Sequence, residues 1–143
     1  MKPVLVRVSI VLAVGLGLFG CERMRDVKRC RALAQRVNGS LDVIAELAPD
    51  AGKTPPAYDK VAHEYDALAA SLDGFDGGTP ELVKSVADYA ALARTSARQA
   101  AALGAALKDD NRGSATLASH ELERLARHEK TLVARIDDEC RPK

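Results

Sequence analysis

The chain has no tryptophan and few other aromatic residues. Of its 143 residues, three are tyrosine and two are phenylalanine. Proteins that hold single-stranded nucleic acid stack its bases on aromatic side chains. The 21 basic residues nearly balance the 20 acidic ones, so the formal net charge is only +1. This balance gives no electrostatic reason to bind nucleic acid, and composition and charge together argue against a nucleic-acid partner.

Long hydrophobic runs are also missing. The longest largely apolar stretch covers residues 8–19, which is shorter than the roughly 20 residues that a helix needs to span a bilayer. It follows a basic start with Lys2 and Arg7 and precedes the small residue Gly20. A basic start, a short apolar middle and a small residue at the end are the parts of a secretory signal. The sequence therefore predicts a signal peptide at residues 1–20.

Cys21 follows this segment directly. Leu18, Gly20 and Cys21 resemble the lipobox of bacterial lipoproteins, and the resemblance covers residues 1–21 only. It implies that the thiol of Cys21 is acylated and that the chain is cut before this residue, which becomes the lipid-bearing first residue. Because two or more acyl chains attach a protein stably to a bilayer, the resemblance implies a firm anchor in a bacterial membrane. The alternatives are an uncleaved signal anchor and an ordinary secretory signal.

The residue after the lipobox cysteine bears on location. In many Gram-negative lipoproteins an aspartate at this position is associated with retention in the inner membrane, and this chain has Glu22 instead. The resemblance therefore favours the outer membrane, with the domain facing the periplasm.

Cysteine is scarce, and its count suggests a pairing. Once Cys21 is assigned to the lipid, Cys30 and Cys140 remain. Exported proteins meet an oxidising environment, in which an even pair is expected to form a disulfide. Two separate buried thiols are the alternative, and a metal site is disfavoured because neither cysteine belongs to a CxxC motif or has a histidine neighbour.

Alanine and leucine are abundant and β-branched residues are sparse, which is typical of helices. Apolar residues recur at helical spacing over residues 22–48, 55–72, 80–107 and 114–139. Asn38, Gly39 and Ser40 interrupt the first segment, and we expect a bend there because the stripe stays in phase. Thr79 and Pro80 give the third segment the clearest start, with a cap and a proline at the first position. Its alanine-rich second half predicts either tight helix packing or a thin core.

Four helices joined by short connections predict an all-α fold, an antiparallel up-down-up-down four-helix bundle. We expect residues 21–29 to form a lipid-anchored stalk and residues 30–143 to form the bundle.

In this topology Cys30 and Cys140 lie at the same end, near the membrane, and Phe75 closes that end of the core. Basic residues gather there and predict either contact with anionic head groups or a solvated stalk: Arg23, Arg25, Lys28, Arg29, Arg31, Arg141 and Lys143.

Glu129 is a polar residue in the centre of the apolar stripe of the fourth segment, between Leu125 and Leu132. A buried carboxylate needs a partner, and counting through the turns places Glu129 near the level of Tyr58. Tyr58, Tyr89 or Ser96 would supply a hydroxyl. The sequence therefore predicts a buried polar site of Glu129, Tyr58 and Tyr89, either a structural hydrogen bond or a functional site. A carboxylate that reaches out to solvent is the third interpretation.

No motif for catalysis, a cofactor or a metal is present. His63, His120 and His128 do not fall at metal-ligand spacing, and we expect them on the surface. No catalytic, cofactor-binding or metal residue is therefore predicted, and an enzyme is the least favoured class.

Two functions remain. The first is an interaction or structural domain of the cell envelope, which contacts an envelope protein through its membrane-distal end at residues 48–56 and 108–113. The alternative is a helical bundle that holds a small apolar molecule or lipid beside the alanine-rich half of the third helix.

Overall fold

The computed structural model describes residues 21–51 and 54–141, and this part of the chain forms helices and short turns without a strand. The helices are α1 (Cys21–Ala51), α2 (Pro55–Leu72), α3 (Pro80–Lys108) and α4 (Arg112–Cys140). Residues 1–20, predicted to be the signal peptide, and Lys143 lie outside the described residues. The predicted all-α class is confirmed.

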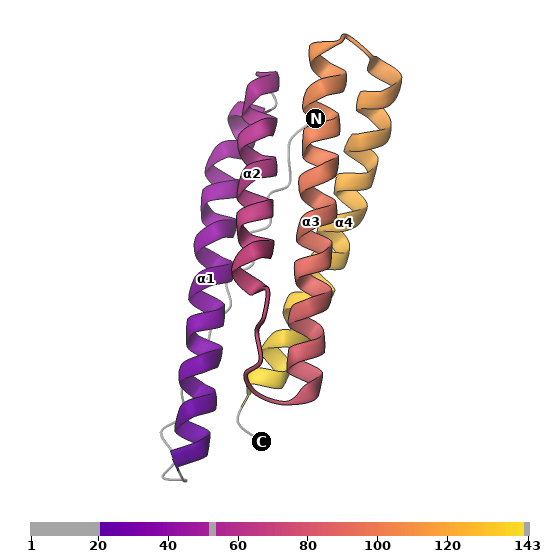
Figure 1. Ribbon diagram of the computed structural model, residues 1–143. Coiled ribbons are helices and arrows are strands. Elements are labelled where there is room, and N and C mark those ends of the chain that lie inside the picture. The colour runs from indigo at the N-terminus through magenta and orange to yellow at the C-terminus, as the bar shows by residue number, and fades with distance from the viewer. Residues whose placement is uncertain (1–20, 52–53, 142–143) are drawn as a thin grey trace.

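The helices form an antiparallel bundle in which each helix packs against its neighbour in the chain (Figure 1). The turns from α1 to α2 and from α3 to α4 lie at the upper end in this view. The start of α1, the α2–α3 turn and the end of α4 lie at the lower end. The predicted up-down-up-down four-helix bundle is therefore confirmed. We call the upper end, with residues 109–111, the distal end, and the lower end, with Cys30 and Cys140, the disulfide end.

Side-chain caps begin two of the helices. The Thr79 Oγ1 accepts a hydrogen bond from the backbone N–H of Leu82 at 3.1 Å, as predicted for α3. Asn111 Oδ1 accepts from the backbone N–H of Ser114 at 3.1 Å, which lets α4 begin at Arg112, two residues before the predicted start. Such caps satisfy N–H groups that have no partner within the helix. At α2, Thr54 occupies the cap position but its side chain makes no cap hydrogen bond.

The first helix is longer than predicted. It continues through Asn38 and Gly39 without a break and ends at Ala51, whereas the predicted helical segment ended at residue 48. Pro49 therefore lies in the last turn. Proline has no backbone N–H, so it removes one hydrogen bond from this turn.

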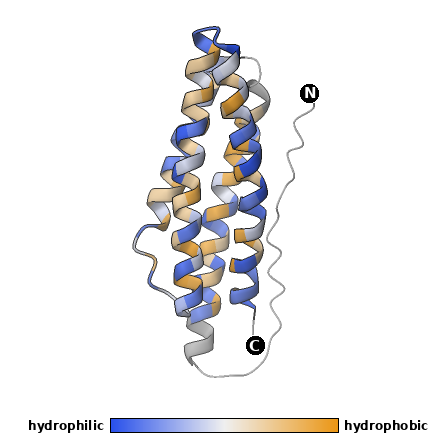
Figure 2. Ribbon diagram, turned by 90° about the vertical axis from the view of Figure 1, so that its right-hand side faces the viewer, coloured by the Kyte–Doolittle hydropathy of each residue, from blue (hydrophilic) through white to orange (hydrophobic). Residues whose placement is uncertain are grey.

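The core changes in character along the bundle. At the disulfide end and in the middle it is built from large side chains on all four helices, including Leu33, Leu68, Tyr89 and Leu132. Towards the distal end it consists largely of alanine, with Leu103, Ala106, Ala115 and Ala118 between α3 and α4. Figure 2 shows hydrophobic and hydrophilic residues on every helix and a hydrophilic turn between α3 and α4. The alanine-rich half of α3 therefore packs against its neighbours through small side chains.

Gly104 shows how closely the helices approach in this half. A Cβ atom at this position would lie 2.9 Å from the Cβ of Tyr58 and 3.2 Å from the backbone oxygen of Pro55. Both atoms belong to the first turn of α2 and are fixed by its backbone. The absence of a side chain at Gly104 therefore permits close packing of α2 on α3.

Gly104→Ala is expected to destabilise the fold relative to Gly39→Ala. Both substitutions gain helix propensity, about 1 kcal/mol each, but a Cβ at Gly39 meets nothing within 4 Å. Only Gly104→Ala brings a Cβ too close to the first turn of α2, and such overpacking costs about 1–3 kcal/mol. Urea unfolding of the two variants measures this difference directly. Equal free energies of unfolding would contradict the close approach of α2 and α3.

Candidate functional site

The predicted cysteine pair is joined in the structure. The sulfur atoms of Cys30 and Cys140 lie 2.08 Å apart, and their Cα atoms are separated by 5.8 Å. Cys30 is buried on the inner face of α1, as its place in the apolar stripe predicted, and Cys140 is half-buried at the end of α4. The disulfide links the first and last helices at one end of the bundle.

The charges at the disulfide end are mixed. Arg29 lies 3.9 Å from Asp26 of the same helix, and Arg141 donates a hydrogen bond to Asp137 at 2.7 Å. The stem of Arg29 also covers Gly77 of the α2–α3 turn, where a Cβ would lie 2.8 Å from its Cδ. Two of the predicted basic residues therefore have local structural roles. Lys28 and Arg31 are exposed, and the side chains of Arg23, Arg25 and Lys143 lie outside the described part of the chain.

Glu129 and Tyr89 form a polar pair in the middle of the bundle. The hydroxyl of Tyr89 donates a hydrogen bond to Oε1 of Glu129 at 2.8 Å. Tyr89 is fully buried in α3, whereas Glu129 is half-buried on α4. Burial raises the pKa of Glu129 above its ordinary value, and the hydrogen bond from Tyr89 offsets part of this rise. Of the three hydroxyl groups predicted as partners of Glu129, on Tyr58, Tyr89 and Ser96, that of Tyr89 makes the hydrogen bond.

Tyr65 of α2 is the second phenol near this carboxylate. Burial raises the pKa of Tyr65, and the negative charge of Glu129 raises it further. The same two causes, together with the hydrogen bond, raise the pKa of Tyr89. Tyr65 was not among the predicted partners of Glu129, although its helical spacing from Val61 and Leu68 places it on the apolar face of α2.

Tyr58 does not join the pair, which corrects the predicted site. It contacts α3 at Gly104 and belongs to the distal part of the core. The reason is its depth along the bundle: Tyr58 lies in the first turn of α2, about 5 Å from that helix's start at ~1.5 Å per residue. Glu129 lies about 25 Å along α4 by the same count. The antiparallel turns therefore place the two residues at different levels.

A hollow of about 140 Å³ lies between α3 and the turn that follows α2. Asp73 and Arg94, which form an ion pair, stand among its lining residues. The remaining walls are mostly apolar and include Leu72, Phe75, Val83, Val86 and Ala90. Phe75 is half-buried and packs against the main core, so it forms part of this wall at the end of the bundle.

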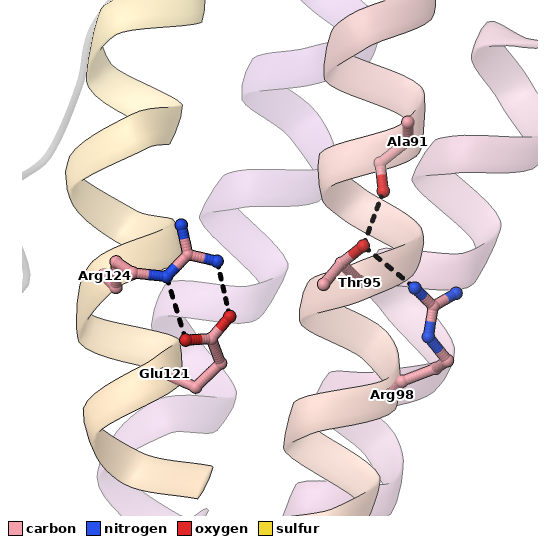
Figure 3. A network of polar contacts seen from close by, with 5 residues as sticks. All are labelled: Ala91, Thr95, Arg98, Glu121 and Arg124. Atoms are coloured by element: carbon pink, nitrogen blue, oxygen red, sulfur yellow. Dashed lines mark hydrogen bonds and ion pairs between the residues drawn. The ribbon is translucent and has the colours of Figure 1, made fainter. Parts of the chain in front are cut away.

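The polar contacts drawn in Figure 3 each lie within one helix, whereas Arg135 of α4 lies 3.7 Å from Asp88 of α3. Figure 3 shows Arg124 bound to Glu121 on α4, while on α3 Thr95 Oγ1 donates to the carbonyl of Ala91 at 3.0 Å and accepts from Arg98 at 3.0 Å. The hydrogen bond from Arg124 lowers the pKa of Glu121. Pairs of this kind stabilise a helix face by a few tenths of a kcal/mol. They form no shared site.

The described residues contain no group of three or more His, Cys, Asp and Glu side chains that would hold a metal ion. His63, His120 and His128 are exposed, as the sequence predicted. Within the described ranges, no helix is long and apolar enough to cross a membrane.

The distal end carries two of the exposed large apolar side chains. Leu117, in the second turn of α4, is 73 % exposed, and Leu107, at the end of α3, is 42 % exposed. Both flank the α3–α4 turn. The third exposed large apolar residue, Val43, lies on α1. Comparisons with protein-family models, curated proteins and solved structures gave no match.

Proposed function

We propose that this chain is a lipid-anchored lipoprotein of the bacterial cell envelope, held by Cys21 in the outer membrane and facing the periplasm. Support for the anchor comes from Leu18, Gly20 and Cys21. Residues 22–29 belong to α1, so they would form a helical stalk of about 12 Å at ~1.5 Å per residue. Its lower end extends past the end of α4 in Figure 1.

We further propose that the bundle is an interaction module whose distal end binds a second envelope protein. The exposure of Leu107 and Leu117 beside the α3–α4 turn carries this proposal. These side chains lie at the end opposite to the proposed anchor, so they would point away from the membrane. Apolar side chains at the centre of an interface contribute most when a partner removes them from water. The proposed partner therefore offers an apolar pocket at the height of this turn.

Leu117→Lys is expected to weaken the partner complex by about tenfold or more, equal to about 1.4 kcal/mol. The substitution places a charge in the contact without disturbing the core, because Leu117 is mostly exposed. Chemical cross-linking in native envelopes, followed by quantitative mass spectrometry, measures the captured partner. Val43→Lys is the matched control, since Val43 is exposed on α1. Loss of the partner with Val43→Lys but not with Leu117→Lys would move the interface to α1. A cross-link to a second copy of the chain would replace the envelope partner with self-association.

A ligand-binding bundle is the second candidate, and the hollow beside Phe75 favours it. The hollow is open to solvent and includes the Asp73–Arg94 ion pair, so a molecule held there would be only partly enclosed. The close contact at Gly104 argues against the alanine-rich half of α3 as the binding place. Native mass spectrometry of the purified chain distinguishes the two functions. A retained small molecule would favour ligand binding, and a bare chain would favour the interaction module.

A further inference from the structure

The carboxylate of Glu129 has no charged partner in the part of the chain that the structure describes. Its Oε1 accepts the hydrogen bond from Tyr89, and none of the ion pairs among the described residues includes it. Among these residues, Asn38 Oδ1 is the one fully buried side-chain oxygen or nitrogen without a hydrogen bond. Oε2 of Glu129 makes no hydrogen bond either, so it reaches solvent. A half-buried carboxylate without a counter-charge is unfavourable.

Tyr65 brings a second polar atom without a partner to this carboxylate. The charge of Glu129 raises the pKa of the Tyr65 phenol, because the two groups lie close together although they belong to α4 and α2. Within residues 21–51 and 54–141 the Tyr65 hydroxyl makes no hydrogen bond, and it is not enclosed. The Tyr65 ring is half-buried and packs against the core cluster that contains Val61. The hydroxyl and Oε2 are therefore both open to a ligand.

The face of α4 that carries Glu129 is uncovered towards the distal end. Leu122, Ala126 and Glu129 follow one another at spacings of four and three residues, so they share this face. Val133, the next residue of the same face, is buried, whereas Glu129 and Leu122 are half-buried and Ala126 is exposed. Helices α1 and α4 approach each other over only a short stretch at the disulfide end. In Figure 1 the first half of α4 lies on the other side of α3 from α1.

We propose that Glu129 and Tyr65 bind the ammonium group of a small primary alkylamine. An ammonium group has a positive charge and three N–H donors. One N–H donates to Oε2 of Glu129 and another to the hydroxyl oxygen of Tyr65, and the charge compensates the carboxylate. The alkyl chain lies along Ala126 and Leu122. Tyr89 is a positioning residue, because it is fully buried and holds the carboxylate through Oε1.

The chemistry of the site favours an ammonium group over a metal ion. Mg²⁺ and Ca²⁺ take six or more oxygen ligands, and the described residues gather no group of three candidate metal ligands. The half-buried ring of Tyr65 also attracts an organic cation. None of the proposed residues lines the hollow beside Phe75. The inference rests neither on the lipid anchor nor on the distal interface.

An NMR titration of the purified chain with n-butylammonium chloride tests the site, with sodium chloride at equal ionic strength as the blank. We expect the ring signals of Tyr65 and the amide signals of residues 122–129 to shift and to reach saturation. The ring signals of Tyr58 should stay unchanged, because Tyr58 belongs to the distal part of the core. n-Butanol lacks the charge and tetramethylammonium lacks the N–H groups, so both should bind about tenfold more weakly or less.

Three variants assign the binding to the proposed residues. Glu129→Gln removes the charge but keeps an acceptor for the Tyr89 hydroxyl, and it should bind n-butylammonium about tenfold more weakly or less. Tyr65→Phe keeps the ring and should lose affinity by a smaller factor, about threefold. Glu123→Gln is the matched control, since Glu123 is an exposed carboxylate on the same helix, and its affinity should equal that of the wild type. Circular dichroism checks that each variant keeps its helix content.

The proposal is wrong if Glu129→Gln binds n-butylammonium as tightly as the wild type. Equal affinity for n-butylammonium and n-butanol would also overturn it, because the charge would then play no part. Shifts that do not saturate, or that centre on other carboxylates, would show only weak attraction of a cation to the surface.

Discussion

Replacing Cys30 and Cys140 together with alanine is expected to lower the free energy of unfolding by about 4–5 kcal/mol. The disulfide spans 110 residues of sequence, so it removes a large share of the conformational freedom of the unfolded chain. Loop-entropy arguments give about 4.7 kcal/mol for a loop of roughly 100 residues. This is a large part of the total stability of a small domain, about 5–15 kcal/mol. Urea unfolding followed by circular dichroism, under oxidising conditions, measures the loss.

Reduced wild-type protein provides the control for this measurement, because it lacks the crosslink but keeps both side chains. It should unfold at nearly the same urea concentration as the double alanine variant. A loss below about 1 kcal/mol in both samples would contradict the loop-entropy account. The entropy effect acts on the unfolded chain, so it requires no change in the folded bundle.

Tyr89→Ala is expected to cost about 3–5 kcal/mol, the usual range for removing a buried aromatic side chain. Tyr89 is 0 % exposed and packs in the main core, which joins all four helices. Tyr89→Phe separates the contribution of the hydroxyl group to stability from that of the ring. It keeps the packing but removes the donor to Glu129, at an expected cost of about 1 kcal/mol. Thermal or urea unfolding measures both variants. Similar losses for the two would assign the effect to the hydrogen bond instead of the ring.

Glu129 also gives the fold a dependence on pH. Its pKa in the folded state is raised above the ordinary value of 4.5, so the folded chain binds more protons than the unfolded chain between these two pKa values. The stability from this group is full below pH 4.5 and is lost as the pH rises through the raised pKa. Glu129→Gln lacks this titration. Its stability relative to the wild type should therefore increase over the same window, and a constant difference would contradict the raised pKa.

The helices could be predicted from the sequence because their signals are local. Thr79 followed by Pro80 marks a helix start in any context, and the structure has the predicted cap there. The predicted end of α1 was wrong because Pro49 and the residues after it are typical of a loop. The structure keeps them in the last turn of the helix. The Cys30–Cys140 pair was predictable because two cysteines remained in a chain expected to be exported, and the antiparallel topology brings their helix ends together.

The polar pair was predicted only in part. The apolar stripe of α4 identified Glu129 as out of place, and the pairing with Tyr89 followed from neighbouring antiparallel helices. Tyr58 was wrongly included, because its depth along the bundle had to be counted through the turns, and small errors in turn length shift that depth by a helical turn. The shorter approach of α1 to α4, compared with the other neighbouring pairs, gave no sequence signal, because both helices carry regular apolar stripes.

The central claim is the lipid anchor at Cys21, and the most direct test is mass spectrometry of the N-terminal peptide of the native protein extracted from membranes. We predict that the chain begins at Cys21 and that this residue carries the added mass of a diacylglycerol group. A chain that retains residues before Cys21, or an unmodified Cys21 at its start, would contradict the account. The bundle would then be exported or anchored by other means, and its distal end would no longer be defined relative to a membrane.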